Sequence, residues 1–414
     1  MSDAKTAAPL LADLVRSGDA QTEAVEITPF VFMSRDVSNA YLVTTSDGDV
    51  AINTGSPDGA ERSVALFKPH RTGPLRAIVL TQSHSDHFGG VPEFREDGTV
   101  IYGGPDYNEA LGDMMGLQAF FRPRTFKLWG STLKRDTPPK PIPDVTPDVL
   151  VDRSLTLDIG GRRFELISAP EGETIDNIIV WMPNEKIVFT GNTFGPVWLS
   201  MPFLNTLRGD KPRLTRNYLK SLDTIRDLGA EIVITGHGDP IVGKDKIRAD
   251  LDKMRAAVVY VRDYTLEGMK AGKTVHQLMR DFAFPEDVRI GDFHGKASWA
   301  VKSIWREYAG WFHYEDGTTE LYGVPRSSVH ADLAELAGGA DAVAARARTR
   351  LDAGDALEAL HLVDVALGAD PKNAAAWGVR KDASQVLLER SGQSNLSETM
   401  WLRSEIAEAE QALG

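Results

Sequence analysis

The chain contains no cysteine among its 414 residues. This absence excludes disulfide bonds, thiolate metal ligands and a cysteine nucleophile, so any metal site must be built from histidine, carboxylate or amide groups. The sequence also has no run of about 18 apolar residues, which a membrane-spanning helix requires, and its first residues have no apolar core of signal-peptide length. We therefore expect a cytoplasmic protein that is not inserted in a membrane.

Positive charge is scarce as well, because 46 Lys and Arg face 59 Asp and Glu, for a net charge of −13. A chain this acidic repels phosphate backbones and anionic membrane surfaces, so neither nucleic acid nor a membrane surface is an expected partner. A small anionic substrate would need local positive charge, from a metal ion or a well-placed arginine. The length predicts two or three domains, or one large domain with an appendage.

Short apolar strands alternate with helices as far as about Gly243, which indicates an α/β domain. Two of the predicted strands, 75–81 and 231–235, have the apolar run of a buried strand, and a proline-rich loop is expected at 137–147. Further strands are predicted at 30–32, 40–45, 50–55, 155–159, 163–167, 178–182 and 186–192, and helices at 60–67 and 214–228.

Beyond Gly243 the apolar residues recur at helical spacing, as in the segment 244–269. Residues 356–377 resemble one helix pair of the tetratricopeptide kind, but about three such pairs are needed for a stable solenoid. A helical dimerisation or docking module fits better. We therefore predict two domains, 1–243 and 244–414, with a second composition change near Pro325.

A polar loop follows the predicted strand 75–81 and holds three candidate metal ligands, His84, Asp86 and His87. Ligands in open α/β sheets tend to bind at the carboxyl ends of strands, and zinc prefers imidazole and carboxylate ligands where thiolates are absent. A helix beginning near Asp86 would turn His87 toward the other two. The alternative is that these are polar residues capping a helix, with Asp86 near its N-cap.

His237 ends a second buried strand, about 150 residues later, in the segment Thr235-Gly-His-Gly-Asp239. Two strand-end histidine clusters are not expected from nine scattered histidines, so His237 favours the metal interpretation. The other six histidines lie in helical or surface-like contexts, and His294 is the one most worth following.

These residues carry a resemblance to a known family. The segment Thr81-Gln-Ser-His-Ser-Asp-His-Phe-Gly-Gly90 resembles the His-x-His-x-Asp-His loop of the metallo-β-lactamase superfamily, and its wording is most similar to the zinc-dependent alkylsulfatase branch. Asn205-Thr-Leu-Arg-Gly209, the stretch 293–312 and the stretch 336–373 resemble further alkylsulfatase segments. The resemblance implies an αββα metallo-β-lactamase sandwich followed by an α-helical dimerisation domain, and a homodimer.

The resemblance also implies roles for individual residues. His84 would bind a first metal, whereas Asp86, His87 and His237 would bind a second. Two more residues fall at metal-ligand positions and three at substrate positions, of which the arginine would bind sulfate by a fork of hydrogen bonds. These are Glu173 and Asn192 for the metals, and Arg208, Asn205 and Trp299 for the substrate.

Three departures from the family pattern lie among these positions. Gln82 stands where the motif has its first histidine, Asn192 where the superfamily has a bridging aspartate, and Trp299 where alkylsulfatases have an active-site histidine. A neutral amide oxygen is a far poorer zinc ligand than an imidazole. We therefore expect one tightly bound zinc, held by Asp86, His87 and His237, and a second that is weak or absent.

The expected activity follows from this site. A bound metal lowers the pKa of water to about 7, Asp86 could both ligate and orient that water, and Arg208 could stabilise the departing anion. The sequence thus predicts a metal-dependent hydrolase of an alkyl sulfate or related anionic ester. One alternative is a hydrolase of a carboxylic ester, lactone or aryl halide, in which Gln82, Asn192 and Trp299 reshape the pocket. The other is a catalytically degenerate, dimeric binding protein. For Arg208 by itself, the alternative is an exposed side chain that merely solvates its loop.

Overall fold

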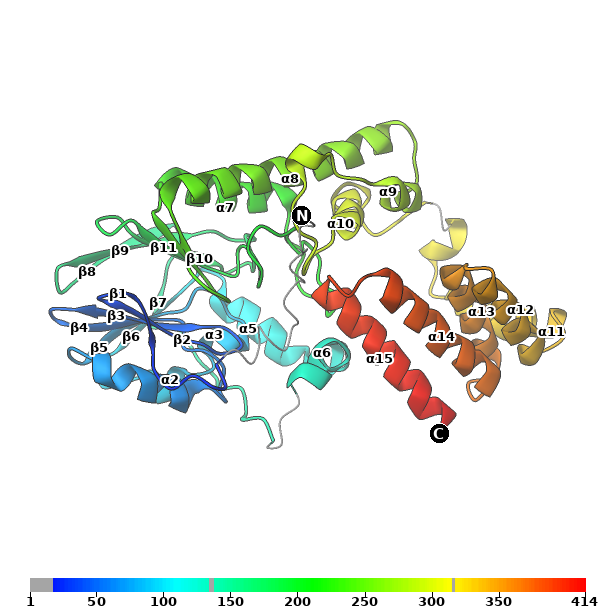
Figure 1. Ribbon diagram of the computed structural model, residues 1–414, viewed down its shortest axis with the longest axis horizontal. Helices are drawn as coiled ribbons and strands as arrows, with labels where there is room; N and C mark the ends of the chain where they lie inside the picture. The colour runs from blue at the N-terminus through cyan, green and yellow to red at the C-terminus, as the bar shows by residue number, and fades with distance from the viewer. Residues whose placement is uncertain (1–17, 134–137, 315–316) are drawn as a thin grey trace, which may run out of the picture. The chain divides into compact units, whose positions relative to one another are not determined.

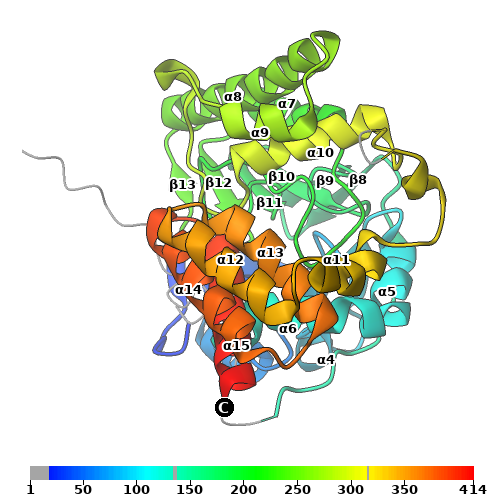
Figure 2. The same cartoon turned by 90° about the vertical axis from the view of Figure 1, so that its right-hand side faces the viewer.

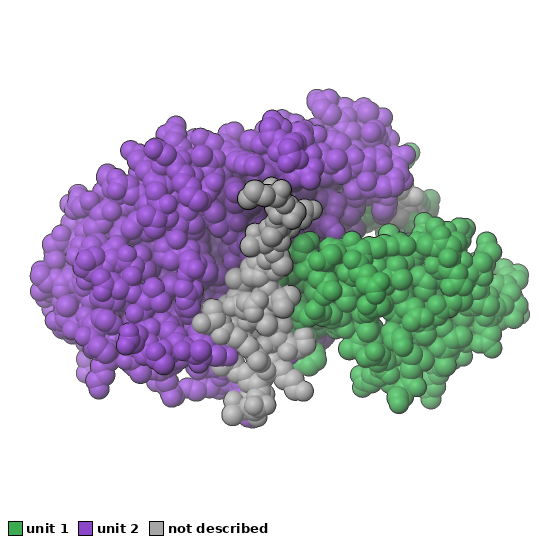
Figure 3. Space-filling model, viewed as in Figure 1, with its two compact units in different colours: residues 1–8, 125–129, 306–414 green, residues 9–124, 130–305 purple. Residues whose placement is uncertain are grey.

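The computed structural model describes residues 18–133, 138–314 and 317–414 of the chain. Among these residues it contains two compact units, shown in Figure 3. The α/β unit consists of residues 18–124 and 130–305, and the helical unit of residues 125–129 and 306–414. Each unit has its own apolar core and is described separately below.

The α/β unit contains two mixed β-sheets (Figure 1). The first sheet has seven strands in sequence order: β1 (Val25–Thr28), β2 (Val31–Ser34), β3 (Ala40–Thr45), β4 (Gly48–Ile52), β5 (Leu75–Val79), β6 (Val100–Gly103) and β7 (Val149–Leu150). The second has six, in the order β13 (Ile241–Val242), β12 (Ile232–Thr235), β11 (Ile187–Gly191), β10 (Ile178–Met182), β9 (Arg162–Ser168) and β8 (Ser154–Ile159). Strands β4 to β7 run parallel, as do β11 and β12, whereas the other neighbours are antiparallel.

The two sheets pack face to face, and their inner faces form one apolar core. Strand β3 contributes side chains to two apolar cores, because successive side chains of a strand point to opposite faces of the sheet. Tyr41 and Val43 lie in the core between the sheets, whereas Leu42 lies in the core beneath the helices of the first sheet. Burial on both faces explains why strands such as β10 are apolar throughout.

Helices cover the outer face of each sheet, as Figures 1 and 2 show. The first sheet is covered by α2 (Ala60–Phe67), α3 (Ser85–Phe88), α4 (Val91–Phe94) and α5 (Tyr107–Gly116), and the second by α7 (Thr215–Leu228) and α8 (Lys244–Lys270). The predicted αββα sandwich is confirmed. The apolar stripe of α7 is buried through Tyr218, Leu222 and Ile225.

Two short 3-10 segments, η1 (Lys68–His70) and η2 (Glu286–Val288), and helix α9 (Val275–Asp281) also lie in the α/β unit. Helices α6 (Gln118–Leu133) and α10 (Ala297–Ala309) lie partly in it, since residues 125–129 and 306–309 belong to the helical unit. The sequence did not predict α5 and α6. Helix α6 has Pro123 in its interior and lacks a regular apolar stripe, so periodicity could not reveal it.

The helical unit contains η3 (Gly317–Leu321), η4 (Arg326–Val329), α11 (His330–Leu336), α12 (Ala340–Asp352), α13 (Ala356–Ala369), α14 (Ala374–Arg390) and α15 (Leu396–Leu413). Its core is rich in alanine, for example Ala347, Ala359 and Ala383, and these small side chains let the helices approach closely. The predicted helix pair at 356–377 corresponds to α13 and the start of α14. No helix among the described residues is long and apolar enough to span a bilayer.

The predicted boundary at Gly243 coincides with the change from β13 to α8. In the structure, the compact α/β unit continues to residue 305 and so includes α8, α9 and most of α10. The division of the sequence into domains 1–243 and 244–414 stays a prediction.

Asn373 generates a prediction about the stability of the helical unit. Its buried side chain caps α14 by accepting a hydrogen bond from the backbone of Ala376 at 2.9 Å, and it donates one to Asp341 at 2.7 Å. We expect Asn373→Ala to lower the free energy of unfolding by about 1–2 kcal/mol, as loss of an N-cap does. Urea unfolding of the full chain, followed by circular dichroism, measures it. Asn373→Ser keeps a capping oxygen and should recover most of the loss; equal stability of the native and Ala proteins would refute the role.

Candidate metal centre

Polar residues that follow four strands meet at one edge of the sandwich. Asn53 follows β4, the segment from Gln82 to His87 follows β5, Asn192 follows β11 and His237 follows β12. Because β4 runs parallel to β5, and β11 to β12, the carboxyl ends of each pair lie together. Both sheets therefore contribute side chains to a single site, at the position where α/β folds commonly bind ligands.

The two sheets are joined at this edge by the segment between β2 and β3. The backbone N–H of Asn39 donates to Gly236 O at 2.8 Å, and its side chain donates to Gly238 O at 2.8 Å. The hydroxyl of Tyr41 donates to Thr235 O at 2.6 Å. These bonds hold the turn that carries His237, and they place Ser38 next to it.

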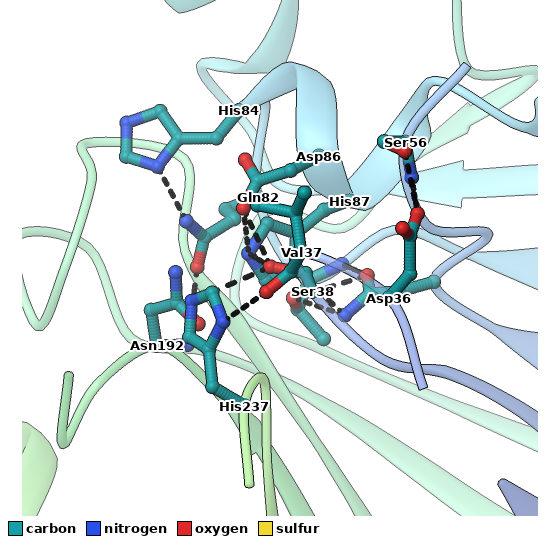
Figure 4. A network of polar contacts seen from close by, with 12 residues as sticks. Asp36, Val37, Ser38, Ser56, Gln82, His84, Asp86, His87, Asn192 and His237 are labelled. Atoms are coloured by element: carbon teal, nitrogen blue, oxygen red, sulfur yellow. Dashed lines mark hydrogen bonds and ion pairs between the residues drawn. The ribbon is translucent and has the colours of Figure 1, made fainter. Parts of the chain in front are cut away.

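The loop after β5 enters α3 at Ser85, one residue before the predicted helix start. His84 is the N-cap residue in an extended conformation, with φ −76° and ψ 137°. The backbone N–H of His87 donates to His84 O at 2.9 Å. This tight turn brings Asp86 and the fully buried His87 to the same place, as Figure 4 shows.

Three of the predicted ligands come together. One ligand atom each from Asp86, His87 and His237 lies within 4.8 Å of the other two. The hydroxyl of Ser38 lies among them: it donates to Asp86 Oδ2 at 2.6 Å, and its oxygen is 2.9 Å from His87 Nε2 and 3.4 Å from His237 Nε2 (Figure 4). One carboxylate and two imidazoles are a common set of three protein ligands in catalytic zinc sites, where water or substrate is the fourth ligand.

The surroundings shift the proton affinities of two of these groups. Burial lowers the pKa of His87 to about 3, because the imidazolium form is poorly solvated there. Burial alone would raise the pKa of Asp86, but the facing His87 and His237 and the hydrogen bond from Ser38 outweigh it, so that pKa lies below its ordinary value. A neutral imidazole and an ionised carboxylate are the forms that bind a metal.

The residues present fit a single metal ion. The Nδ1–H of His237 donates to Val37 O at 2.5 Å, which leaves the Nε2 lone pair directed into the cluster. The side-chain oxygen of Asn192 is buried and has no hydrogen-bond partner, as a further oxygen ligand would before a metal binds. It lies against Gly236, where a Cβ atom would come within 2.0 Å of that oxygen and 2.9 Å of His87 Cε1. Only glycine leaves this space open.

At the first metal position that the family resemblance implies, the expected ligand side chains form hydrogen bonds with other protein groups. Gln82 Oε1 accepts from the backbone N–H of Asn192 at 3.2 Å, so its amide nitrogen faces His84 Nδ1, at 2.7 Å. His84 Nε2 lies 2.9 Å from Arg208 Nη2 and 3.2 Å from Asp210 Oδ2. Both ring nitrogens of His84 thus have protein partners, and the candidate cluster among the described residues does not include this histidine.

The predicted ligand Glu173 lies in a buried ion pair. Arg213 Nη2 contacts Glu173 Oε1 at 2.5 Å, and the same guanidinium donates to the backbone oxygens of Glu173 and Phe203. Of the predicted substrate residues, Asn205 is half-buried on the loop that carries Arg208. Trp299 lies on α10 with its ring 5.6 Å from that of Phe203.

Sequence reasoning missed three residues of the site, Ser38, Asn53 and Asp210. Asn53 could have been found, because it follows a buried strand just as His84 and His237 do. Asp210 stands two residues after the predicted Arg208 and pairs with it at 3.2 Å. Ser38 carries no comparable signal, since a lone serine in a loop indicates no particular chemistry.

Comparison with known protein families agrees with this geometry. Residues 33–237 match the model of the metallo-beta-lactamase superfamily, and residues 274–407 match the model of the alkyl sulfatase dimerisation domain. The first match includes the four strand ends of the site and all strands of the two sheets except β1, the start of β2 and β13, and the second includes most of the helical unit.

Individual relatives point the same way. A linear primary-alkylsulfatase of a Pseudomonas species is 26% identical over 328 residues, which is 73% of this chain and 61% of that protein. An alkyl/aryl-sulfatase of Saccharomyces cerevisiae is 25% identical over 393 residues, 87% of this chain and 60% of that protein. The structure of an inverting sec-alkylsulfatase from Pseudomonas superposes with a TM-score of 0.82 at 21% identity, covering 94% of this chain and 65% of that one.

The chain thus spans about three-fifths of the length of the curated relatives that it matches. Within that span, the motif of the loop after β5, the αββα architecture and both family models agree. The chain therefore belongs to the metallo-β-lactamase superfamily, as an alkylsulfatase-like member.

Proposed function

We propose that this chain is a metal-dependent hydrolase that uses one zinc ion, held by Asp86, His87 and His237, to cleave sulfate esters. The observation that carries the proposal is the convergence of these three ligand atoms within 4.8 Å, in a chain that is 25–26% identical to two curated alkylsulfatases. Zinc in such a site supplies a hydroxide nucleophile at neutral pH by lowering the pKa of water.

The protein's own groups prepare the site for this chemistry. Asp86 is ionised at neutral pH, since its pKa is depressed, and the Ser38 hydroxyl fixes the orientation of its Oδ2. Val37 O fixes the orientation and the tautomer of His237. Asn192 contributes a neutral oxygen rather than a charge, so Asp86 is the one carboxylate of the cluster. A single negative charge suits one divalent ion better than two.

An anionic substrate is supported by the positive charge beside the cluster. Burial most of all, and next the nearby Arg213, His237 and Arg208, lower the pKa of His294 to about 3, so cationic side chains lie near this histidine in a chain of net charge −13. Arg213 uses three of its nitrogens on protein oxygens. Arg208 is bound through Nη2, and a guanidinium has five N–H donors, so Arg208 is the better sulfate ligand.

Aromatic rings border the same region and suit the organic part of an alkyl sulfate. The rings of Phe203 and His294 lie 4.9 Å apart and edge to face, and the ring of Phe203 lies 5.6 Å from that of Trp299. Such rings offer apolar contact area to a hydrocarbon chain. Trp299 would thus bind the alkyl group rather than the sulfate.

We also propose that the chain forms a homodimer through its helical residues, because residues 274–407 match a model described as alkyl sulfatase dimerisation. The exposed large apolar side chains of α11 and α13, such as Leu333, Leu336 and Leu357, offer contact area for a second copy.

Metal content is the first prediction of the proposal. Protein purified without added metal, and then given zinc, should hold about one zinc per chain by elemental analysis. His87→Ala should lose it, because two remaining ligands bind too weakly. Gln82→His should bind a second ion, since it returns an imidazole beside His84.

The control for the metal measurement is His276→Ala, which removes an exposed histidine of α9 and should keep one zinc. Two zinc ions per native chain would contradict the mononuclear site. No zinc in the folded native protein would reject the hydrolase and leave the binding-protein alternative.

Substrate charge gives the next prediction. Arg208→Gln should lower kcat/KM for an alkyl sulfate about ten- to hundredfold, because a hydrogen bond to a charged group contributes about 1.5–3 kcal/mol. A neutral carboxylic ester of the same chain length should be affected only a few-fold. Steady-state kinetics on both esters measure this, with the exposed Arg216→Gln as the charge-matched control. An equal loss on both esters would remove Arg208 from sulfate recognition.

His294 makes stability depend on pH. Its pKa of about 3 in the folded chain lies below its ordinary value of 6.5. Above pH 6.5 neither state takes the proton, whereas between pH 6.5 and 3 the unfolded state binds a proton that the folded state refuses, so stability falls. His294→Gln should therefore lose less stability between pH 7 and 4.5 than the native protein. Urea unfolding of the metal-free full chain at pH 7 and pH 4.5, followed by tryptophan fluorescence, tests this, and an unchanged pH dependence in His294→Gln would contradict it.

A further inference from the structure

The amide of Asn53 is oriented by a donor whose identity is certain. The backbone N–H of Thr81 lies 2.9 Å from Asn53 Oδ1, and a backbone N–H can only donate. The atom that it meets must therefore be the amide oxygen. The hydroxyl of Thr81 also lies within 3.1 Å of that oxygen. The amide nitrogen of Asn53 is thereby turned toward His87, with Nδ2 at 2.9 Å from His87 Nδ1.

This orientation decides which nitrogen of His87 carries the proton. The Asn53 amide nitrogen can only donate, so His87 Nδ1 must accept. A neutral imidazole has one donor and one acceptor nitrogen, and the proton of His87 therefore lies on Nε2. There it donates to Ser38 Oγ at 2.9 Å, and the Ser38 hydroxyl donates in turn to Asp86 Oδ2 at 2.6 Å. All donors in this chain of hydrogen bonds point from Asn53 toward Asp86.

A metal ligand requires the opposite arrangement. His87 Nε2 faces the cluster, and to bind a metal it needs its lone pair there, so the proton must move to Nδ1. An N–H at Nδ1 would then meet the N–H of Asn53. His237 shows the arrangement that suits a metal, because its Nδ1–H donates to the carbonyl of Val37 and its Nε2 is left free of a proton.

We propose that Asn53 is a positioning residue that weakens metal binding, by holding His87 in the tautomer whose proton lies on the metal-facing nitrogen. The inference rests on the proposed function in taking Asp86, His87 and His237 as the metal site. Filling the site requires the Asn53 amide to turn over, which separates it from Thr81, or the His87–Asn53 hydrogen bond to break.

Burial makes either change costly. Asn53, Thr81, His87 and Ser38 are all at most 1% exposed, so no bulk water replaces a lost partner. A buried donor left without an acceptor destabilises a protein by about 1–3 kcal/mol. The metal must supply this energy when it binds, and affinity falls accordingly.

Asn53→Asp tests the inference directly. A carboxylate keeps both acceptor contacts to Thr81 and offers a second oxygen to His87 Nδ1–H. Asn53 has a positive φ of 55°, a conformation that Asp also tolerates. We expect Asn53→Asp to bind zinc at least tenfold more tightly than the native protein, in competition with a chromophoric chelator. Mutation of the groups that hydrogen-bond to the second ring nitrogen of a ligand histidine typically changes metal affinity ten- to hundredfold.

Asn53→Gly is the matched variant, because glycine adopts the same backbone conformation and removes the opposing donor without adding charge. Its zinc affinity should exceed that of the native protein, and a thermal melt should verify that both variants fold. Weaker or unchanged binding by a folded Asn53→Gly, or unchanged binding by a folded Asn53→Asp, would overturn the proposal, since Asn53 would then support the metal or be indifferent to it.

The tautomer can be observed without any metal. Long-range ¹H–¹⁵N spectra of metal-free protein labelled at histidine should show His87 protonated on Nε2 in the native chain and on Nδ1 in Asn53→Asp, with His87→Gln assigning the signals. This separates the two proposals. The native tautomer with no zinc uptake by any variant would reject the metal site alone, whereas zinc uptake with a proton already on Nδ1 would reject the role of Asn53 alone.

Discussion

The candidate site depends on the hydrogen bonds that join the two sheets at one edge. Asn39 and Tyr41, from the first sheet, hold the turn of residues 235–238 after β12 of the second. His237 comes from that turn, whereas Asp86 and His87 come from the loop after β5. Neither half has three ligands by itself. The short, buried polar contacts between the halves therefore create the cluster, and Ser38 lies at its centre because it directly precedes Asn39.

Neutral amides surround this centre where charged or imidazole groups would favour metal ions. Gln82 donates to His84 rather than presenting a nitrogen lone pair, Asn192 offers an unpartnered oxygen without a charge, and Asn53 donates to the back of His87. Each amide lowers the negative charge or the basicity available to a cation. Their common effect is to limit the negative charge available to a cation, and the positive Arg208 lies close to His84, where the family pattern implies a first metal.

The sequence predicted the architecture, and it placed Asp86, His87 and His237 at the strand ends where the structure brings them together, because apolar runs ending in polar loops reveal buried strands and their carboxyl ends. It could not predict that His84 would turn to Arg208 and Asp210, or that Glu173 would pair with Arg213, since those partners come from loops far away in the chain. Loops have no periodicity, and their side-chain partners depend on tertiary packing. The same limit hid α6, whose pattern is irregular around Pro123.

Beside His84, where the family pattern implies a metal ion, this chain has the guanidinium of Arg208. The two kinds of positive charge bind ligands differently. A metal ion presents its charge at a point and exchanges ligands in any direction, whereas a guanidinium is planar and directs hydrogen bonds to paired oxygens. Arg208 is anchored by Asp210 at 3.2 Å, so its plane is oriented before a substrate arrives. A sulfate has the paired oxygens that this plane can meet, and a lactone or an aryl halide lacks them. On the geometry of the arginine alone, the proposed sulfate ester therefore suits this arrangement better than those neutral substrates would.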